Sequence, residues 1–263
     1  MPNHVINKLI ISGTKIDRDK LKSQMAWEDS DGSKEIFSFN SILPMPAELI
    51  GTTSGSYVLE SLWLVDKSLY ESFVSDHRES NSVKFAIARG SVVESELLEV
   101  LKKFASYGNH PAEFTDRSEA LQWFSENKPE VIELGKFHAA AVKSTGFLDW
   151  YEWSIVNWGT KWDAYKVNRT ETDEKLIYTF ETAWSQPAPV INKLITMYPN
   201  LCFEHHYFDE MDNFWGINNY VGGSLESERS SHLEDKVTLC IELKGVEPDE
   251  EEEFKKTKKR PRL

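Results

Sequence analysis

The chain has only two cysteines among its 263 residues, and it contains no run of eighteen apolar residues. Two cysteines are too few for a disulfide framework, and no transmembrane helix can form without a long apolar run. Cys202 and Cys240 each stand in an apolar, strand-like segment, so we expect buried thiols in a reducing cytoplasm; a disulfide between them is the alternative. The first residues lack the regions of a secretory signal. We therefore expect a cytoplasmic protein with no membrane partner.

Motifs for catalysis and for nucleotide binding are also missing. The sequence has no G-x-S-x-G elbow, no G-x-x-x-x-G-K-[ST] loop and no G-x-G-x-x-G fingerprint, and neither cysteine lies in a recognised motif. The double glycine at residues 222–223 indicates a turn at the end of a strand. These absences favour a protein that is not an enzyme and uses no cofactor.

Positive charge is in short supply, because 43 acidic residues face 30 basic ones and the formal net charge is −13. Residues 247–263 hold six acids and six bases, which cancel, so the whole excess belongs to residues 1–246. An acidic body repels nucleic-acid phosphates and attracts basic protein surfaces. The alternative is that the charge only keeps the protein soluble. The charged tail of residues 247–263 is predicted to be disordered.

The hexapeptide VINKLI occurs twice, at residues 5–10 and at residues 190–195. The first copy continues a run rich in isoleucine that ends at Gly13, which predicts a strand. The second copy follows Pro187 and Pro189 and forms an apolar stripe at helical spacing, which predicts a helix. Because the flanking residues decide each structure, the repeat is not a duplicated structural unit.

The order of the remaining elements predicts an α+β fold. A helix over residues 14–25 and a strand over residues 36–41 follow the first strand. A strand at 174–184, the helix at 190–198 and a strand at 200–208 form a second group. This order favours a ferredoxin-like split βαβ sandwich, where the name describes a shape and no iron–sulfur cluster. Further predictions are a hairpin partner over residues 214–223, a polar loop at 224–235 and an extra strand at 236–243.

Apolar residues recur at helical spacing through most of the middle of the chain. The sequence thus predicts four segments: a first βαβ half (1–56), a large helical insertion between the two halves (57–158), a second βαβ half with extra strands (159–246) and the tail (247–263).

Five stretches, in order along the chain, carry a family resemblance. They are MPNHVINKL at the start, FSFNSILPMP, NWGTKWDAY, FETAWSQPAPVI and YFDEMDNFWG. Together they resemble the YubB-like family of bacteriophage- and plasmid-borne proteins with a ferredoxin-like domain. The acidic turn departs from the family's frequent Glu-Gly pair, since Met211 follows Glu210. The resemblance implies the fold and an origin in a mobile element, within a bacterial host cell. It implies no reaction, cofactor or catalytic residue.

The segment EHHYFDEMD gathers residue types that bind metals. His205 and His206 are consecutive on a predicted strand, so their side chains point to opposite faces and only one can join a given site. The candidate metal ligands are Glu204, His206, Asp209 and Asp212. The alternative is a polar strand edge with an acidic turn, because zinc needs three or four converging ligands.

A second candidate site is rich in aromatic residues. Its members are Trp158, Lys161, Trp162, Tyr165 and Trp184. Tryptophan and tyrosine concentrate in pockets and at the energetic centres of interfaces, so the set could bind a partner. The alternative is that these side chains fill the core between the sheet and the insertion.

Our leading hypothesis is a non-enzymatic accessory protein of a phage or plasmid that binds a host protein through an acidic surface. A nucleic-acid enzyme or a defence complex is the expected target, because such proteins expose cationic grooves, and occupying the groove would inhibit it. One alternative is a metal-assisted hydrolase built on His206 and Asp209. Another is a single-stranded nucleic-acid binding module with stacking aromatics on the sheet face, which the charge argues against.

Overall fold

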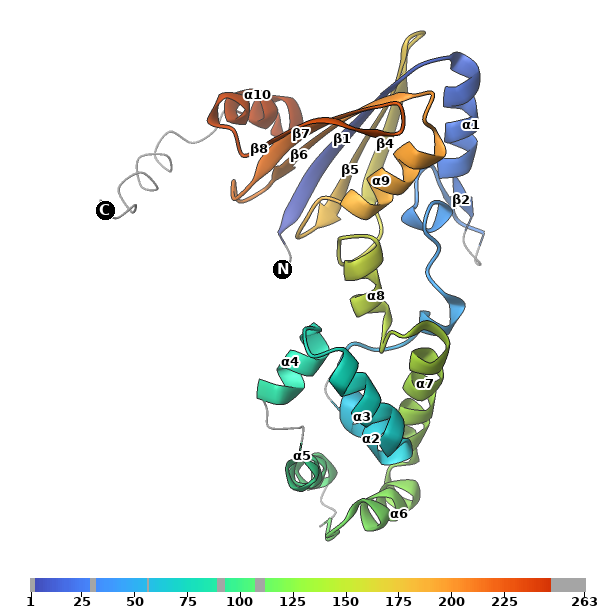
Figure 1. Ribbon diagram of the computed structural model, residues 1–263, viewed down its shortest axis with the longest axis vertical. Helices are drawn as coiled ribbons and strands as arrows, with labels where there is room; N and C mark the ends of the chain where they lie inside the picture. The colour runs from blue at the N-terminus through green and yellow to red at the C-terminus, as the bar shows by residue number, and fades with distance from the viewer. Residues whose placement is uncertain (1–2, 29–31, 56, 89–92, 107–111, 247–263) are drawn as a thin grey trace, which may run out of the picture. The chain divides into compact units, whose positions relative to one another are not determined.

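The computed structural model describes residues 3–28, 32–55, 57–88, 93–106 and 112–246. The chain divides into two compact units (Figure 1). The sheet unit comprises Met1–Pro44 with Asn157–Leu263, and the helical unit comprises Met45–Val156. The helical unit starts earlier than the predicted insertion, because Leu49 is fully buried and Thr52 accepts a hydrogen bond from the backbone N–H of Trp150 (2.9 Å). The predicted tail of residues 247–263 lies outside the described residues.

The sheet unit carries a six-stranded antiparallel sheet with strand order β4-β5-β1-β6-β7-β8. Strand β1 lies in the interior of the sheet and pairs with β5 from His4 opposite Ala183 to Ser12 opposite Lys175. Its other neighbour is β6, where Lys8 faces His206. The strands are β1 (His4–Ser12), β4 (Tyr165–Glu171), β5 (Lys175–Ala183), β6 (Cys202–Asp209), β7 (Trp215–Val221) and β8 (Ser224–Ser230).

Helices α1 (Lys15–Met25) and α9 (Ala188–Met197) cover one face of the sheet, which we call the inner face (Figure 1). The alternation of β1 buries Val5, Asn7, Leu9 and Ile11 on this face. The two helices meet where Tyr198 Oη donates to the carbonyl of Lys20 (3.4 Å). The first VINKLI copy is thus a strand and the second a helix, as their flanking residues predict.

Asn7 fixes the register of the inner face. Its amide nitrogen donates to Thr182 Oγ1 of β5 (2.9 Å), and its amide oxygen lies 3.0 Å from Nε2 of His205 in β6. One buried side chain therefore connects three neighbouring strands. A slip of one residue would break both contacts and exchange the two faces of the strand.

The strand predicted at residues 36–41 is wrong. This segment holds a 3-10 turn, η1 (Phe39–Ser41), after the short strands β2 (Trp27–Glu28) and β3 (Lys34–Glu35). The carboxylate of Asp163 accepts hydrogen bonds from Ser38 Oγ (2.5 Å) and from the backbone N–H of Phe39 (2.6 Å), which bends the chain. Phe37 and Phe39 are both buried and pack edge to face, so their alternation reflects core filling.

The predicted loop at 224–235 and strand at 236–243 are also wrong. The first contains β8, and the second lies in helix α10 (Leu233–Lys244). Leu239, Cys240 and Leu243 form an apolar stripe at helical spacing that packs on Phe208 and Trp215. Both cysteines are free; Cys240 is buried as expected, but Cys202 is exposed at the start of β6.

The helical unit has a core of its own around α2. Trp63 is buried there, and Arg117 caps the end of α2 by donating to the carbonyls of Trp63 and Leu64 (both 2.7 Å). Its helices are α2 (Val58–Val65), α3 (Lys67–Asp76), α4 (Asn81–Ala88), α5 (Glu94–Ser106), α6 (Arg117–Asn127), α7 (Pro129–Thr145) and α8 (Trp150–Asn157), preceded by the 3-10 turn η2 (Ala47–Leu49). None of the described helices is both long and apolar enough to cross a membrane.

A glycine in α7 sets how closely α2 and α7 approach. A Cβ added at Gly135 would lie 2.3 Å from the carbonyl oxygen of Ser61. Alanine at an exposed helical position is more favourable than glycine by about 1 kcal/mol. We expect Gly135→Ala to lower the free energy of unfolding by about 2 kcal/mol instead, because the backbone of α2 or α7 must move to admit the methyl group. Urea unfolding followed by circular dichroism checks this, with Ala140→Gly on the exposed side of α7 reporting helix propensity alone. A Gly135→Ala variant more stable than the parent would contradict the packing.

Candidate binding site on the outer face of the sheet

The second face of the sheet, which we call the outer face, carries half-buried residues of β1 and β5. Ile6 faces Glu181, Lys8 faces Thr179 and Ile10 faces Ile177 across the two strands. In an antiparallel pair such opposite residues project to the same side. The outer face over β5 and β1 therefore carries isoleucine side chains next to charged ones.

Helix α10 covers another part of the outer face, over β6 and β7. Besides its apolar stripe, it is held by Glu242, whose two carboxylate oxygens bind Nδ1 of His206 and Nζ of Lys8 (both 2.7 Å). Near the end of the helix, Lys244 Nζ contacts Asp212 (2.5 Å) and Lys236 lies 3.4 Å from the same carboxylate. Polar contacts therefore fasten both sides of α10.

The Glu242 contacts shift the protonation equilibria of the pair. Burial opposes a charged imidazole, but the hydrogen bonds and charges of Glu242 and Glu204 outweigh burial and raise the pKa of His206. The hydrogen bond from His206, together with Lys8, lowers the pKa of Glu242 to about 2. When protonated, the ring of His206 donates from both nitrogens, to Glu242 and to Glu204 (2.6 Å).

The four predicted metal ligands are not brought together as a ligand set. Glu204 and His206 touch, but Asp209 binds Asn213 (2.7 Å), and two lysines neutralise Asp212. Among the described residues, no group of three or more His, Cys, Asp or Glu side chains could hold a metal ion. His205 points to the inner face, opposite His206, as the strand alternation predicts, and burial lowers its pKa to about 3.

A groove runs along the uncovered part of the outer face, with a volume of about 340 Å³. Two ion pairs lie in its walls, Lys8 with Glu242 (2.7 Å) and Lys166 with Glu181 (2.9 Å). Its lining comes from β1 (Ile6, Lys8), β4 (Lys166, Asn168), β5 (Thr179, Phe180, Glu181) and α10 (Glu242, Leu243). The groove thus offers carboxylates that the protein's own lysines occupy.

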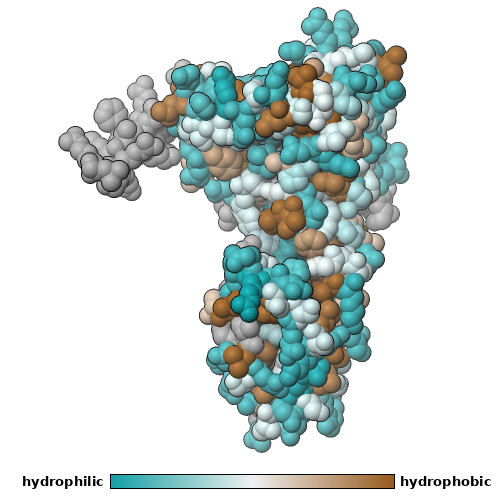
Figure 2. All heavy atoms as spheres, viewed as in Figure 1, coloured by the Kyte–Doolittle hydropathy of each residue, from teal (hydrophilic) through white to brown (hydrophobic). Residues whose placement is uncertain are grey.

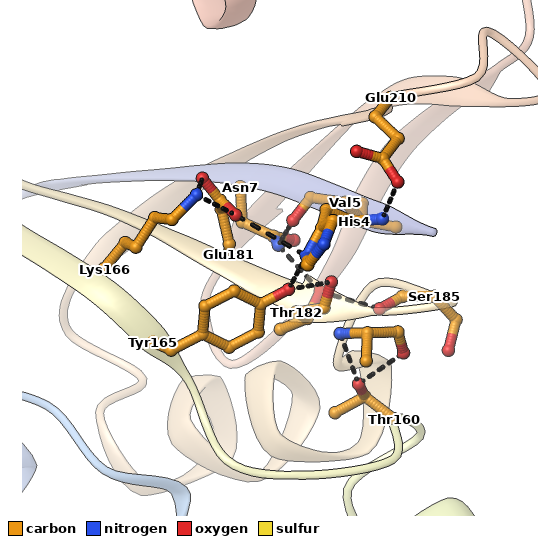
Figure 3. A network of polar contacts seen from close by, with 11 residues as sticks. His4, Val5, Asn7, Thr160, Tyr165, Lys166, Glu181, Thr182, Ser185 and Glu210 are labelled. Atoms are coloured by element: carbon orange, nitrogen blue, oxygen red, sulfur yellow. Dashed lines mark hydrogen bonds and ion pairs between the residues drawn. The ribbon is translucent and has the colours of Figure 1, made fainter. Parts of the chain in front are cut away.

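Glu181 also belongs to a polar network at the edge of the groove. Figure 3 shows the ring of Tyr165 pointing toward His4, beside Glu181 and Lys166. The Tyr165 hydroxyl contacts Nδ1 of His4 and donates to the carbonyl of Thr182 (3.2 Å). Burial and the nearby carboxylates Glu181 and Glu210 raise the pKa of Tyr165 to about 12. The phenol therefore stays protonated near neutral pH and does not act as a base.

Four of the five predicted aromatic-site residues lie together next to this network. Nζ of Lys161 is 4.8 Å from the ring centroid of Trp162 and 5.0 Å from that of Trp184. The ring of Trp162 is also 6.4 Å from that of Tyr165. Trp158 is the exception, since it is buried against Phe39 and its indole N–H donates to the carbonyl of Leu43 (2.9 Å). Trp158 therefore contributes to the core of the sheet unit.

Trp184 adopts an unusual backbone conformation. Its φ is +73°, in the left-handed region, and 39% of the residue is exposed. For a bulky side chain this conformation costs roughly 1–2 kcal/mol. Its N–H donates to the carbonyl of Asn3 (2.9 Å), directly after the end of β5. Such strained positions concentrate at functional sites.

The rings that the described sheet places on its outer face are covered or half-buried: Phe208 and Trp215 pack under α10, and Tyr165 contacts His4. Tyr178 and Phe180 of β5 are buried on the inner face, as are Phe203 and Tyr207 of β6. Exposed stacking of single-stranded bases needs accessible rings. The outer-face residues of the described β1 and β5 are instead isoleucine, threonine and charged side chains, apart from His4, Ser12 and the buried Ala183.

Several residues of the site are not among those that the sequence analysis predicts. They are His4, Lys8, Lys166, Glu181 and Glu242. Alternation in β1 and β5 could have placed His4, Lys8 and Glu181 on one face. The place of Glu242 could not be predicted, because its segment is a helix and not the predicted strand.

Comparisons with known proteins address the sheet unit. Residues 157–259 match a family model described as the ferredoxin-like domain in Api92-like protein. The C-terminal part of this mixed α+β chain thus holds a ferredoxin-like domain, and a large helical region precedes it. The predicted YubB-like relationship and the phage or plasmid origin stay predictions.

The chain is similar in structure to a protein api92 from Yersinia pseudotuberculosis, known from a crystal structure. The alignment covers 88% of this chain and 99% of the api92 chain. The two share 10% sequence identity with a TM-score of 0.41, so the likeness carries no argument about this chain. No curated protein matches the sequence.

The fastening of α10 should depend on pH. The folded pKa of His206 is raised, so its stabilising contribution is complete below about pH 6.5 and is lost as pH rises through the folded pKa. The folded pKa of Glu242 is lowered, so its contribution is present above about pH 4.5 and is lost toward its folded pKa of about 2. We expect NMR of the imidazole ring to give a midpoint above 6.5 for His206, returning toward 6.5 in Glu242→Gln.

His232→Gln provides the control for stability, because His232 is exposed at the start of α10. In calorimetry, the Tm of the parent protein should fall between pH 6 and pH 9. The fall should be smaller in His206→Gln and unchanged in His232→Gln. Equal pH profiles for the parent and His206→Gln would contradict this assignment.

Proposed function

We propose that this chain is a non-enzymatic binding protein whose outer face docks on a basic surface of another protein. The observation that carries the proposal is the groove, where Glu181 and Glu242 are matched by the chain's own Lys166 and Lys8. A partner that brings arginine or lysine side chains can exchange with these lysines. The aromatic cluster of Lys161, Trp162, Tyr165 and Trp184 adjoins the groove through Glu181 and Tyr165.

The energy of exchange favours an incoming arginine at Glu181. The side chain of Lys166 is 68% exposed, so its ion pair with Glu181 is worth only about 0–1 kcal/mol. Glu181 itself is 18% exposed and is held in place beside His4. A guanidinium can bind a carboxylate through two parallel hydrogen bonds, which an ammonium cannot. Replacing Lys166 by a partner's arginine therefore costs little and adds a directional contact.

The acidic excess supports long-range attraction by both units. The sheet unit up to residue 246 has 20 acidic and 14 basic residues, and the helical unit has 17 acidic and 10 basic residues. Such an excess speeds encounter with a basic partner and is screened by salt. Because both units share the charge, the groove is what would make the contact specific.

Hydrophobic burial is a weaker candidate for the driving force. On the face seen in Figure 2, hydrophobic residues lie in small separate groups among polar ones. Exposed apolar residues of this kind, such as Ile16, Met211 and Leu233, are usual on protein surfaces. The charged groove gives the more specific basis for recognition.

For the fold, we propose that β1-α1 and β4-β5-α9-β6 together form the split βαβ sandwich. The strand order β4-β5-β1-β6 supports this arrangement, since it sets the two halves side by side. The helical unit would then be an insertion between α1 and β4.

For the biological role, we propose an accessory protein of a phage or plasmid in the bacterial cytoplasm, as the YubB-like resemblance implies. The partner would be a host nucleic-acid enzyme or a defence complex. Covering its cationic groove would inhibit it, so an anti-defence role follows from the charge.

A basic peptide tests the docking surface directly. We expect a labelled eight-residue peptide of alternating arginine and glycine to bind the full chain in fluorescence anisotropy, and more tightly at 50 mM than at 150 mM NaCl. Loss of one carboxylate contact at Glu181→Gln should weaken binding about fivefold, corresponding to roughly 1 kcal/mol. Glu226→Gln, on the exposed edge strand β8, removes the same charge elsewhere and should bind as the parent does.

Host proteins captured from a bacterial lysate should be released by the same peptide and should bind Glu181→Gln less. No binding of the arginine peptide at 50 mM NaCl, or equal losses in both variants, would count against the proposed surface.

A further inference from the structure

The aromatic cluster already holds a cation. The ammonium of Lys161 lies within 5.0 Å of the ring centroids of both Trp162 and Trp184, inside the range of a cation–π interaction. Trp162 is the next residue in the chain, but Trp184 comes from the far end of β5. Two indoles from separate segments therefore converge on one positive charge.

Hydrogen bonds hold the two walls of this site in fixed positions. Thr160 Oγ1 donates to the carbonyl of Ala183 (2.7 Å) and accepts from the backbone N–H of the same residue (3.1 Å). The Ser185 hydroxyl donates to the carbonyl of Gly159. These contacts bind the segment before Trp162 to the residues on either side of Trp184. Fixed walls reduce the entropic cost of receiving a ligand.

The conformation of Trp184 adds to this arrangement. A left-handed backbone at a bulky residue persists only where surrounding contacts impose it. Here the backbone hydrogen bond to Asn3 holds the residue, of which 39% is exposed. A tryptophan that served only the core would gain nothing from this position.

We propose that Trp162 and Trp184 form a binding site for an arginine side chain of the basic partner, and that Lys161 occupies this site in the free protein. The inference rests on the proposed function and names the chemistry of its ligand. Guanidinium is planar and less strongly hydrated than ammonium, so it stacks on indole better than Lys161 does. The phenol of Tyr165 and the carboxylate of Glu181 extend the same surface. Lys161 keeps the indoles from other contacts until an arginine displaces it.

Removal of Lys161 should therefore increase affinity for a free cation. The probe is N-acetyl-arginine amide, titrated into the full chain with ¹⁵N-labelled tryptophan while the indole N–H signals are followed. We expect selective shifts of Trp162 and Trp184, assigned by single tryptophan-to-phenylalanine variants. Lys161→Ala should bind the probe at least about threefold more tightly than the parent.

Lys193→Ala is the matched control, since Lys193 is exposed on α9 and the same charge is removed. It should leave the affinity unchanged. Trp184→Leu should abolish the gain that Lys161→Ala produces, and N-acetyl-glutamine amide should shift neither indole. Failure of both indole signals to shift in Lys161→Ala, or an equal gain in Lys193→Ala, would overturn the proposal.

The small probe also separates this inference from the proposed function. Absent indole shifts with intact binding of the arginine–glycine peptide would overturn the indole site alone. Specific shifts without peptide binding would overturn the docking surface and keep the indole site.

Discussion

Asn7 provides the constraint on which the other features of the sheet unit depend. It is buried in β1, and it joins that strand to Thr182 on one side and to His205 on the other. Because successive side chains of a strand alternate, fixing Asn7 inward fixes Lys8 outward. Lys8 and His206 then meet Glu242, and α10 takes its place on the outer face. The position of the groove follows from this register, since β1 contributes Ile6 and Lys8 to its lining.

On the outer face, carboxylates form ion pairs with cations from the same chain. Glu242 takes Lys8 and His206, Glu181 takes Lys166, and Asp212 takes Lys244. These pairs differ in accessibility, and that difference decides their roles. The His206 side chain is only 9% exposed, so removing one partner would leave a buried charge, which is costly. The exposed Lys166 can leave Glu181 with little loss. The same chemistry therefore fastens α10 through Glu242 and pairs Glu181 with an exposed, weakly held lysine.

The sequence predicts those parts of the fold where local pattern and tertiary packing agree. The two VINKLI copies are assigned correctly because Gly13 and the prolines around residue 190 restrict the backbone directly. Residues 36–41 are not, because their alternating phenylalanines satisfy the core from a turn that Asp163 stabilises, more than 120 residues away in the chain. The strand predicted at residues 236–243 is wrong for a similar reason. The apolar stripe of this helix is defined by its packing against Phe208 and Trp215, which are distant in the sequence. Four aromatic-site residues could be chosen from composition, but their ionic neighbours could not, since pairing depends on strand register.

The arrangement of Lys161 bears on how an acidic protein of the proposed function would discriminate among basic partners. Net charge alone attracts any cationic surface, and salt screens that attraction at about 8 Å under physiological conditions. Selectivity then has to come from short-range contacts whose strength depends on geometry. Two indoles already satisfied by a lysine give such a contact, because a weak ligand gains nothing by displacing an internal ammonium. In the proposed site, a group that stacks better and also reaches the Glu181 carboxylate would yield a net gain. Under the proposed function, self-pairing would convert a general electrostatic attraction into a preference for arginine in a defined position.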